Sequence, residues 1–101
     1  MLRAQARTPA SQAVIELAVR VDGARVLDAR FLAFGCPTTI AVGAFLAEHL
    51  RGASRARAAA LDARAIRAAL EIPDERAHCA LVGEDVLKEV LARWDARKSD
   101  H

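Results

Sequence analysis

The sequence predicts a single two-layer α+β domain, in which helices cover one face of a small antiparallel sheet. Before Pro37, apolar and polar residues alternate at a period of two, as in half-buried strands. After Pro37, apolar residues recur at helical spacing instead. Strands followed by a run of helices are typical of an α+β domain. Neither an internal repeat nor a linker interrupts the 101 residues, so we expect one domain over residues 1–101.

Two strands form the expected hairpin. Residues 14–21, VIELAVRV, place their apolar side chains on one face, and a turn containing Gly23 follows them. Alternation resumes over residues 26–34, which we expect to pair antiparallel with the first strand. The inward-facing residues of this second strand are predicted to be Leu27, Ala29, Phe31 and Ala33. Residues 2–8 leave room for a third strand at the edge of the hairpin.

Helices are predicted for the chain after the hairpin. Pro37 suits the first turn of a helix over residues 37–51, and Gly52 provides its stop. Two short helices rich in alanine and arginine follow at about residues 54–61 and 63–70. In the first helix, Ile40, Ala44 and Ala47 are predicted to form one apolar stripe, with Phe45 and Leu46 beside it.

A last helix is predicted over residues 79–97, after Pro73 has ended the second short helix. Its apolar residues recur every four positions, which indicates one buried stripe. The residues of this stripe are Val82, Val86, Val90 and Trp94. We therefore expect the tryptophan to belong to the core of the domain.

Composition and charge exclude several classes of function. The chain has 15 basic and 13 acidic residues, and the basic ones are spread along it, so nothing indicates a nucleic-acid partner. No apolar run reaches the roughly 18 residues of a transmembrane helix, and the N-terminus lacks the apolar segment of a signal peptide. These observations predict a cytoplasmic protein without a membrane partner. Two cysteines are too few for a disulfide scaffold, which leaves free thiols or metal ligands.

Both cysteines stand where a helix is predicted to begin. Cys36 precedes Pro37, and Cys79 opens the last helix directly after His78. Unpaired N–H groups and the helix dipole stabilise a thiolate at such a position, and a thiolate binds metal or attacks sulfur. Alternatively, both cysteines are small buried hydrophobic residues and His78 is a surface residue. Spacing alone leaves the two interpretations equally open.

Two segments resemble the U-type iron–sulfur cluster assembly scaffolds, the family of IscU and of the NifU N-terminal domain. The first, DARFLAFGCPTTIAVGAFLAEHLRG, is similar to the family's segment in which a strand ends in Phe/Tyr-Gly-Cys and enters a helix. The second, AHCALVGEDVLKEVL, is similar to the family's segment that begins with His-Cys. Their separation also matches, and the resemblance extends over about residues 9–95.

The resemblance implies a site for iron or a [2Fe–2S] cluster. It assigns Cys36, His78 and Cys79 as ligands, gives Cys79 the further role of accepting sulfur from a cysteine desulfurase, and places Arg76 close to the cluster. The family's first cysteine is replaced by Ser11, which leaves this hydroxyl as a weak fourth ligand. The family's aspartate is replaced by Ala13.

A loop before the His-Cys pair departs from the family as well. Where members carry Leu-Pro-Pro-Val-Lys, the sequence recognised by a chaperone, this chain has IPDER, with Asp74 and Glu75 at unmatched positions. Recognition by a chaperone is therefore in doubt. The partners that the resemblance implies are a cysteine desulfurase and proteins that accept the cluster.

Three functions remain open from the sequence. The first is a scaffold or carrier that binds iron or a labile cluster and transfers it to acceptor proteins. The second is a paralogue without scaffold activity, which binds zinc or no metal and acts as an interaction or regulatory module of the sulfur-mobilisation machinery. The third is a small thiol enzyme or a sulfur-transfer acceptor that carries sulfur on Cys79 as a persulfide, with any bound metal incidental. If Cys36, His78 and Cys79 bound zinc with an open fourth position, no general base would stand out near that site in the sequence, so we do not expect an enzyme that catalyses hydrolysis.

Overall fold

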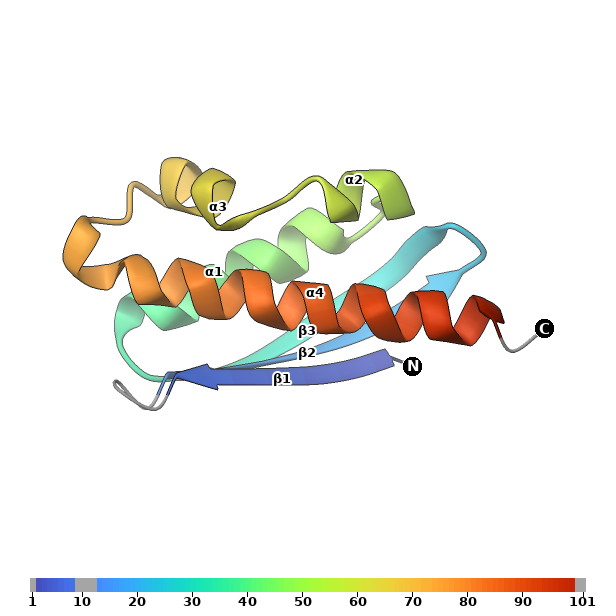
Figure 1. Ribbon diagram of the computed structural model, residues 1–101, viewed down its shortest axis with the longest axis horizontal. Coiled ribbons are helices and arrows are strands. Elements are labelled where there is room, and N and C mark those ends of the chain that lie inside the picture. The colour runs from blue at the N-terminus through green and yellow to red at the C-terminus, as the bar shows by residue number, and fades with distance from the viewer. Residues whose placement is uncertain (1, 9–12, 100–101) are drawn as a thin grey trace.

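The computed structural model describes residues 2–8 and 13–99, with the side chains of residues 97–99 left out of the description. Three strands come first and helices follow them (Figure 1). The strands are β1 (Leu2–Thr8), β2 (Ala13–Asp22) and β3 (Arg25–Phe34). The helices are α1 (Pro37–Leu50), α2 (Arg55–Ala59), α3 (Ala63–Leu70), the short 3-10 helix η1 (Asp74–Arg76) and α4 (Ala77–Ser99).

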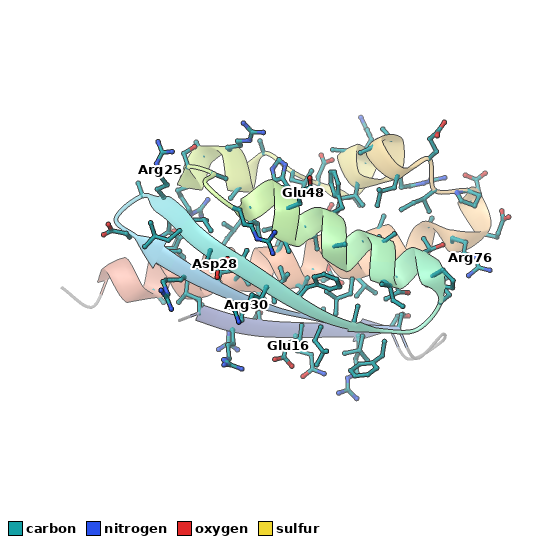
Figure 2. All side chains as sticks on the ribbon, turned by 180° about the vertical axis from the view of Figure 1, so that it is seen from behind. Glu16, Arg25, Asp28, Arg30, Glu48 and Arg76 are labelled. Atoms are coloured by element: carbon teal, nitrogen blue, oxygen red, sulfur yellow. The ribbon has the colours of Figure 1, made fainter. Side chains whose placement is uncertain are left out.

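The sheet is antiparallel throughout, with the strand order β1-β2-β3. Both predicted strands are confirmed, and residues 2–8 form the third strand at the edge. The helices α1 and α4 lie on one face of this sheet, and α2 and α3 lie on the same side of it (Figure 1). Glu16 projects from the other face, which none of the described helices covers (Figure 2). The predicted α+β class with one covered face is therefore confirmed.

The inward face of β3 differs from the prediction at Leu27 and also at Phe31, which is 36% exposed although its ring lies beside Gly43 of α1. Leu27 was expected to point into the core, but its side chain is 55% exposed. The register shifts after Arg20, because Val26 pairs with Val21 while Asp28 pairs with Arg20. Leu27 is thus the extra residue of a β-bulge, and Val26 takes the buried position instead.

The first long helix buries a different stripe from the predicted one. Ile40 is 46% exposed and Ala44 is exposed as well, whereas Ala47 is buried as expected. The residues of α1 that are buried are Thr39, Val42, Gly43, Leu46, Ala47 and Leu50. A Cβ atom on Gly43 would lie 2.6 Å from Cδ2 of Phe31, so the missing side chain lets α1 approach the sheet closely. Close approach at a glycine, which apolar periodicity does not register, explains the rotated stripe.

The last helix agrees with its predicted stripe. Val82, Val86, Val90 and Trp94 are each at most 3% exposed. The helix begins at Ala77, two residues earlier than predicted, because η1 turns the chain after Pro73 and leads directly into it. Within the described residues, no helix combines the length and apolarity needed to cross a lipid bilayer.

Candidate functional site

Cys36 is held at the corner where β3 turns into α1. It is the N-cap of α1, with Pro37 as the first helical residue, so the corner follows the predicted pattern. Gly35 before it has a φ of +136°, and a Cβ atom there would lie 3.0 Å from Oγ1 of Thr39 and 3.3 Å from Cα of Ala13. Glycine is therefore required for this corner, both by its backbone angle and by the lack of space.

Cys79 lies at the same corner, although it belongs to the last helix, α4. It lies in the first turn of α4, and its side chain is 0% exposed. Its Sγ atom lies 3.8 Å from Sγ of Cys36, although the two residues are 43 positions apart. Both are free thiols, and Cys36 is partly exposed. The structure thus brings the two cysteines together, and their role as ligands stays a prediction.

Thr39 joins the two thiols, and sequence reasoning did not find it. Its hydroxyl oxygen lies 3.4 Å from Sγ of Cys79 and 3.6 Å from Sγ of Cys36. It is the one buried polar residue of the core among the described positions. In the sequence, the signal that could have found it is its place three residues after Cys36, in the first turn of the predicted helix.

The two thiols differ in acidity. Burial by itself raises the pKa of Cys36, but hydrogen bonds with the side chain and backbone of Thr39, with Cys79 and with Arg76 outweigh it and lower the pKa to about 6. Burial raises the pKa of Cys79, and the neighbouring Cys36 raises it further. Near neutral pH the pair therefore consists of an accessible thiolate at Cys36 and a buried neutral thiol at Cys79.

A pocket of about 350 Å³ opens next to the pair. Its lining residues are Ala13, Cys36, Thr39, Glu75, Arg76 and His78. Arg76 lies at the end of the molecule where β3 meets α1, as Figure 2 shows. The structure thus brings His78 and Arg76 to the same pocket as Cys36. It also adds Glu75, an acidic residue that the sequence analysis had not assigned to the site.

The donor set fits a metal in part. Two thiolates on one tetrahedral metal, with bonds of about 2.3 Å, lie about 3.8 Å apart, and the two sulfur atoms have a separation of 3.8 Å. Among the described residues, however, no three His, Cys, Asp or Glu side chains already form a group that could hold a metal ion. Ligation by His78 therefore stays a prediction. The suggested fourth ligand, Ser11, lies outside the described residues.

Curated relatives match most of the chain. The iron–sulfur cluster assembly scaffold protein IscU of Haemophilus influenzae is 32% identical over 91 residues, which are 89% of this chain and 72% of that protein. The IscU scaffold protein of Escherichia coli K12 is 31% identical over 91 residues and 71% of its length. The mitochondrial iron sulfur cluster assembly protein 1 of Yarrowia lipolytica is 32% identical over half of its length. One relative, from Drosophila melanogaster, is named an iron–sulfur cluster assembly enzyme.

Solved structures share the fold. A putative iron–sulfur cluster assembly scaffold protein for the SUF system, from Fervidobacterium islandicum AW-1, superposes with a TM-score of 0.72 at 16% identity. That superposition covers 89% of this chain and 79% of the other. A hypothetical protein superposes with a TM-score of 0.75 at 22% identity, over 90% of this chain and 81% of the other. The family described as the NifU-like N-terminal domain matches residues 3–101, nearly the whole sequence. The chain therefore belongs to the family of NifU-like N-terminal domains.

Proposed function

We propose that this protein is a scaffold for iron–sulfur cluster assembly, which binds iron or a labile cluster as its cargo and passes it to acceptor proteins. Cys36, His78 and Cys79 are the ligands in this proposal, and Cys79 also accepts sulfur from a cysteine desulfurase. The observation that carries it is the 3.8 Å separation of the two cysteine sulfur atoms beside an open pocket, in a chain of this family.

The pocket suits a cargo that has to enter and leave. Cys36 offers a thiolate near neutral pH, since its pKa is about 6. Cys79 loses its proton when the metal binds, as thiol ligands must. Arg76, which also lines the pocket, supplies a positive charge beside the two sulfur atoms. The Cys36 thiolate attracts a ferrous ion, whereas Arg76 offsets the negative charge of the thiolates and of a cluster bound to them, in a pocket that is open to solvent.

An incomplete ligand set makes the proposed cargo exchangeable. A [2Fe–2S] cluster takes four protein ligands, mostly thiolates. Cys36, Cys79 and His78 supply three, and a serine stands at position 11 where the family has a cysteine. A hydroxyl binds iron more weakly than a thiolate at neutral pH, so an external thiol can compete for the fourth position. We therefore propose a shorter-lived cluster than a four-ligand site would hold.

A second candidate rests on the same donor set. Two cysteines and one histidine are a recognised set for zinc, with a fourth position left open. In this alternative the protein is a zinc-binding paralogue without scaffold activity, which serves as an interaction or regulatory module of the sulfur-mobilisation machinery. The replacements at Ser11 and Ala13 favour it, because they remove two groups of the family's site.

Reconstitution separates the two candidates. Anaerobic protein, stripped of metal, is incubated with ferrous iron and sulfide, and the visible spectrum and the iron content are measured. We expect a labile chromophore in the parent, its loss in Cys36→Ala, and its retention in the control Thr38→Val. Ser11→Cys should lengthen the lifetime of the chromophore. One tightly bound zinc, with no chromophore in either the parent or Ser11→Cys, would contradict the scaffold function and favour the zinc module.

A further inference from the structure

The two thiols of the site differ most in what can reach them. Cys36 is partly exposed and lines the pocket, whereas Cys79 is 0% exposed and is not among the described residues that line it. A persulfide on another protein therefore meets Cys36 first. Cys79 is buried, and within the part of the chain that the structure describes its sulfur lies 3.8 Å from Sγ of Cys36 and 3.4 Å from Oγ1 of Thr39.

We infer that sulfur reaches Cys79 by a relay, in which Cys36 takes a sulfane sulfur from an external persulfide and passes it inward to Cys79. This inference rests on the proposed function, because it describes how sulfur would enter the same site. Thr39 passes the proton between the two thiols in this relay, since its buried hydroxyl lies beside both sulfur atoms, within 3.6 Å of each.

The first step is an exchange of one sulfur atom at the pocket. The Cys36 thiolate attacks the outer sulfur of a donor persulfide, R–S–S⁻. A bond forms between Sγ of Cys36 and that outer sulfur, the S–S bond of the donor breaks, and R–S⁻ leaves. The product is a persulfide on Cys36, and no external electron is needed because the sulfane sulfur keeps its oxidation state.

The second step transfers the same sulfur across the contact. A persulfide S–S bond is about 2.05 Å long, so the outer sulfur of a Cys36 persulfide can span much of the 3.8 Å between the two Sγ atoms. Sγ of Cys79 attacks this outer sulfur, and the bond to Sγ of Cys36 breaks. The Cys79 proton moves to Sγ of Cys36 by way of the Thr39 hydroxyl, which lies 3.4 Å from one sulfur and 3.6 Å from the other. The persulfide now resides on the buried cysteine.

Burial of the final product, the Cys79 persulfide, protects the transferred sulfur from other thiols. An exposed persulfide is open to attack by any thiol in solution, because rates of thiol exchange depend on access. Once the sulfur sits on Cys79, the fold shields it, and it lies 3.8 Å from the second thiol of the site. Sulfur is thus stored where a metal bound by both thiols would meet it.

Time-resolved mapping of the sulfur tests the relay. Metal-free full-length protein is mixed anaerobically with glutathione persulfide, quenched at intervals with an alkylating agent, and digested for mass spectrometry. In the parent we expect the added sulfur first on Cys36 and later on Cys79. In Cys79→Ser it should stay on Cys36, and in Cys36→Ser labelling of Cys79 should be lost. Circular dichroism confirms that each variant is folded.

Three results would overturn the relay. They are labelling of Cys79 in Cys36→Ser at the parent's rate, sulfur that never leaves Cys36 in the parent, and a Cys36–Cys79 disulfide formed with release of hydrosulfide. The order of labelling in the parent needs no variant, so the test holds even if a substitution impairs folding. The iron and sulfide chromophore is measured separately on the same preparation, so the relay can fail while the scaffold function stands, and the reverse.

The role of Thr39 has its own readout. Thr39→Val removes the hydroxyl but keeps the shape, and should slow the second step by about fivefold or more, the value of one hydrogen bond, while the first step keeps its rate. Thr39→Ser should restore the second step, and Thr38→Val is the matched control. If Thr39→Ser restores the rate of the second step, a purely structural role of Thr39 is contradicted. If Thr39→Val leaves that rate unchanged, Thr39 takes no part in the relay.

Discussion

The two ends of α4 are built for different purposes. At its first turn, Cys79 meets Cys36 and Thr39 through sulfur contacts of 3.4 to 3.8 Å beside an open pocket. Near its other end, Trp94 is 2% exposed, and its Nε1 donates a hydrogen bond of 3.3 Å to the carbonyl oxygen of Gly23 in the hairpin turn. One end thus carries weak, exchangeable contacts, and the other carries the packing that holds the helix to the sheet.

The comparison teaches that the packing that holds α4 is provided mainly by the end that lies away from the site. Arg55 lies over the Trp94 ring at 5.9 Å and forms an ion pair of 2.7 Å with Asp95, so the far end is fastened by several kinds of contact. The cysteine end can then keep thiols free for chemistry. Substitutions at the two ends are therefore expected to separate stability from thiol reactivity.

The largest effect is expected from Trp94→Ala. Removal of a buried tryptophan costs about 3–5 kcal/mol of unfolding free energy, because its packing and the hydrogen bond to Gly23 are both lost. Chemical denaturation followed by circular dichroism measures this loss. Alkylation of Cys36 under folding conditions should keep the parent's rate. The control Trp94→Phe retains most of the packing and should lose less unfolding free energy. An equal loss in both variants would assign the stability to the indole N–H alone.

A smaller loss of unfolding free energy is expected from Gly83→Ala, which adds a methyl group to α4 near the end that carries Cys79. Its Cβ atom would lie 2.6 Å from Cγ1 of Val42, where α1 and α4 touch. Overpacking of this kind costs about 1–3 kcal/mol. Because the two helices also position the two cysteines, we expect faster alkylation of Cys79 as well. A variant with lower stability but a fully protected Cys79 would show that the pair does not depend on this contact.

The pH dependence of stability should come from the cysteine end. The pKa of Cys36 is lowered from 9.0 to about 6, so its thiolate stabilises the folded state fully above pH 9, and this contribution falls between pH 9 and pH 6 and is absent below. The raised pKa of Cys79 acts in the opposite sense at alkaline pH. Unfolding free energies of the parent minus those of Cys36→Ser should therefore increase from pH 6 toward neutrality. A flat difference would contradict a lowered pKa at Cys36.

The smallest effect is expected at the exposed ion pair of the far end. Asp95→Asn removes the charge that faces Arg55, and both side chains are partly open to solvent. Exposed ion pairs are worth about 0–1 kcal/mol and are screened by salt. Thermal unfolding at low and high ionic strength measures it. A loss that persists in high salt would mean that this pair does more than a surface contact does.

The prediction of elements succeeded where one residue pattern dominated. The last helix has a single apolar stripe ending at Trp94, so periodicity alone identified its buried face. The first helix is apolar on several sides, so the sequence predicted the helix correctly but not the face that it buries. Ile40 is exposed and Gly43 is buried. Leu27 was placed wrongly because a bulge is a property of the pairing between two strands, which no single strand records.

By itself the sequence determined the order of the elements, the antiparallel hairpin, the position of each cysteine at the start of a helix and the core role of Trp94. These follow from local period, turn residues and helix signals, which act between residues close together in the chain. Only the tertiary structure decided that Cys36 and Cys79 lie 3.8 Å apart, that the Thr39 hydroxyl lies beside both sulfur atoms and that one thiol is accessible while the other is buried. Such features depend on how α1 and α4 pack on the sheet, because residues 43 positions apart meet only when the whole core has formed.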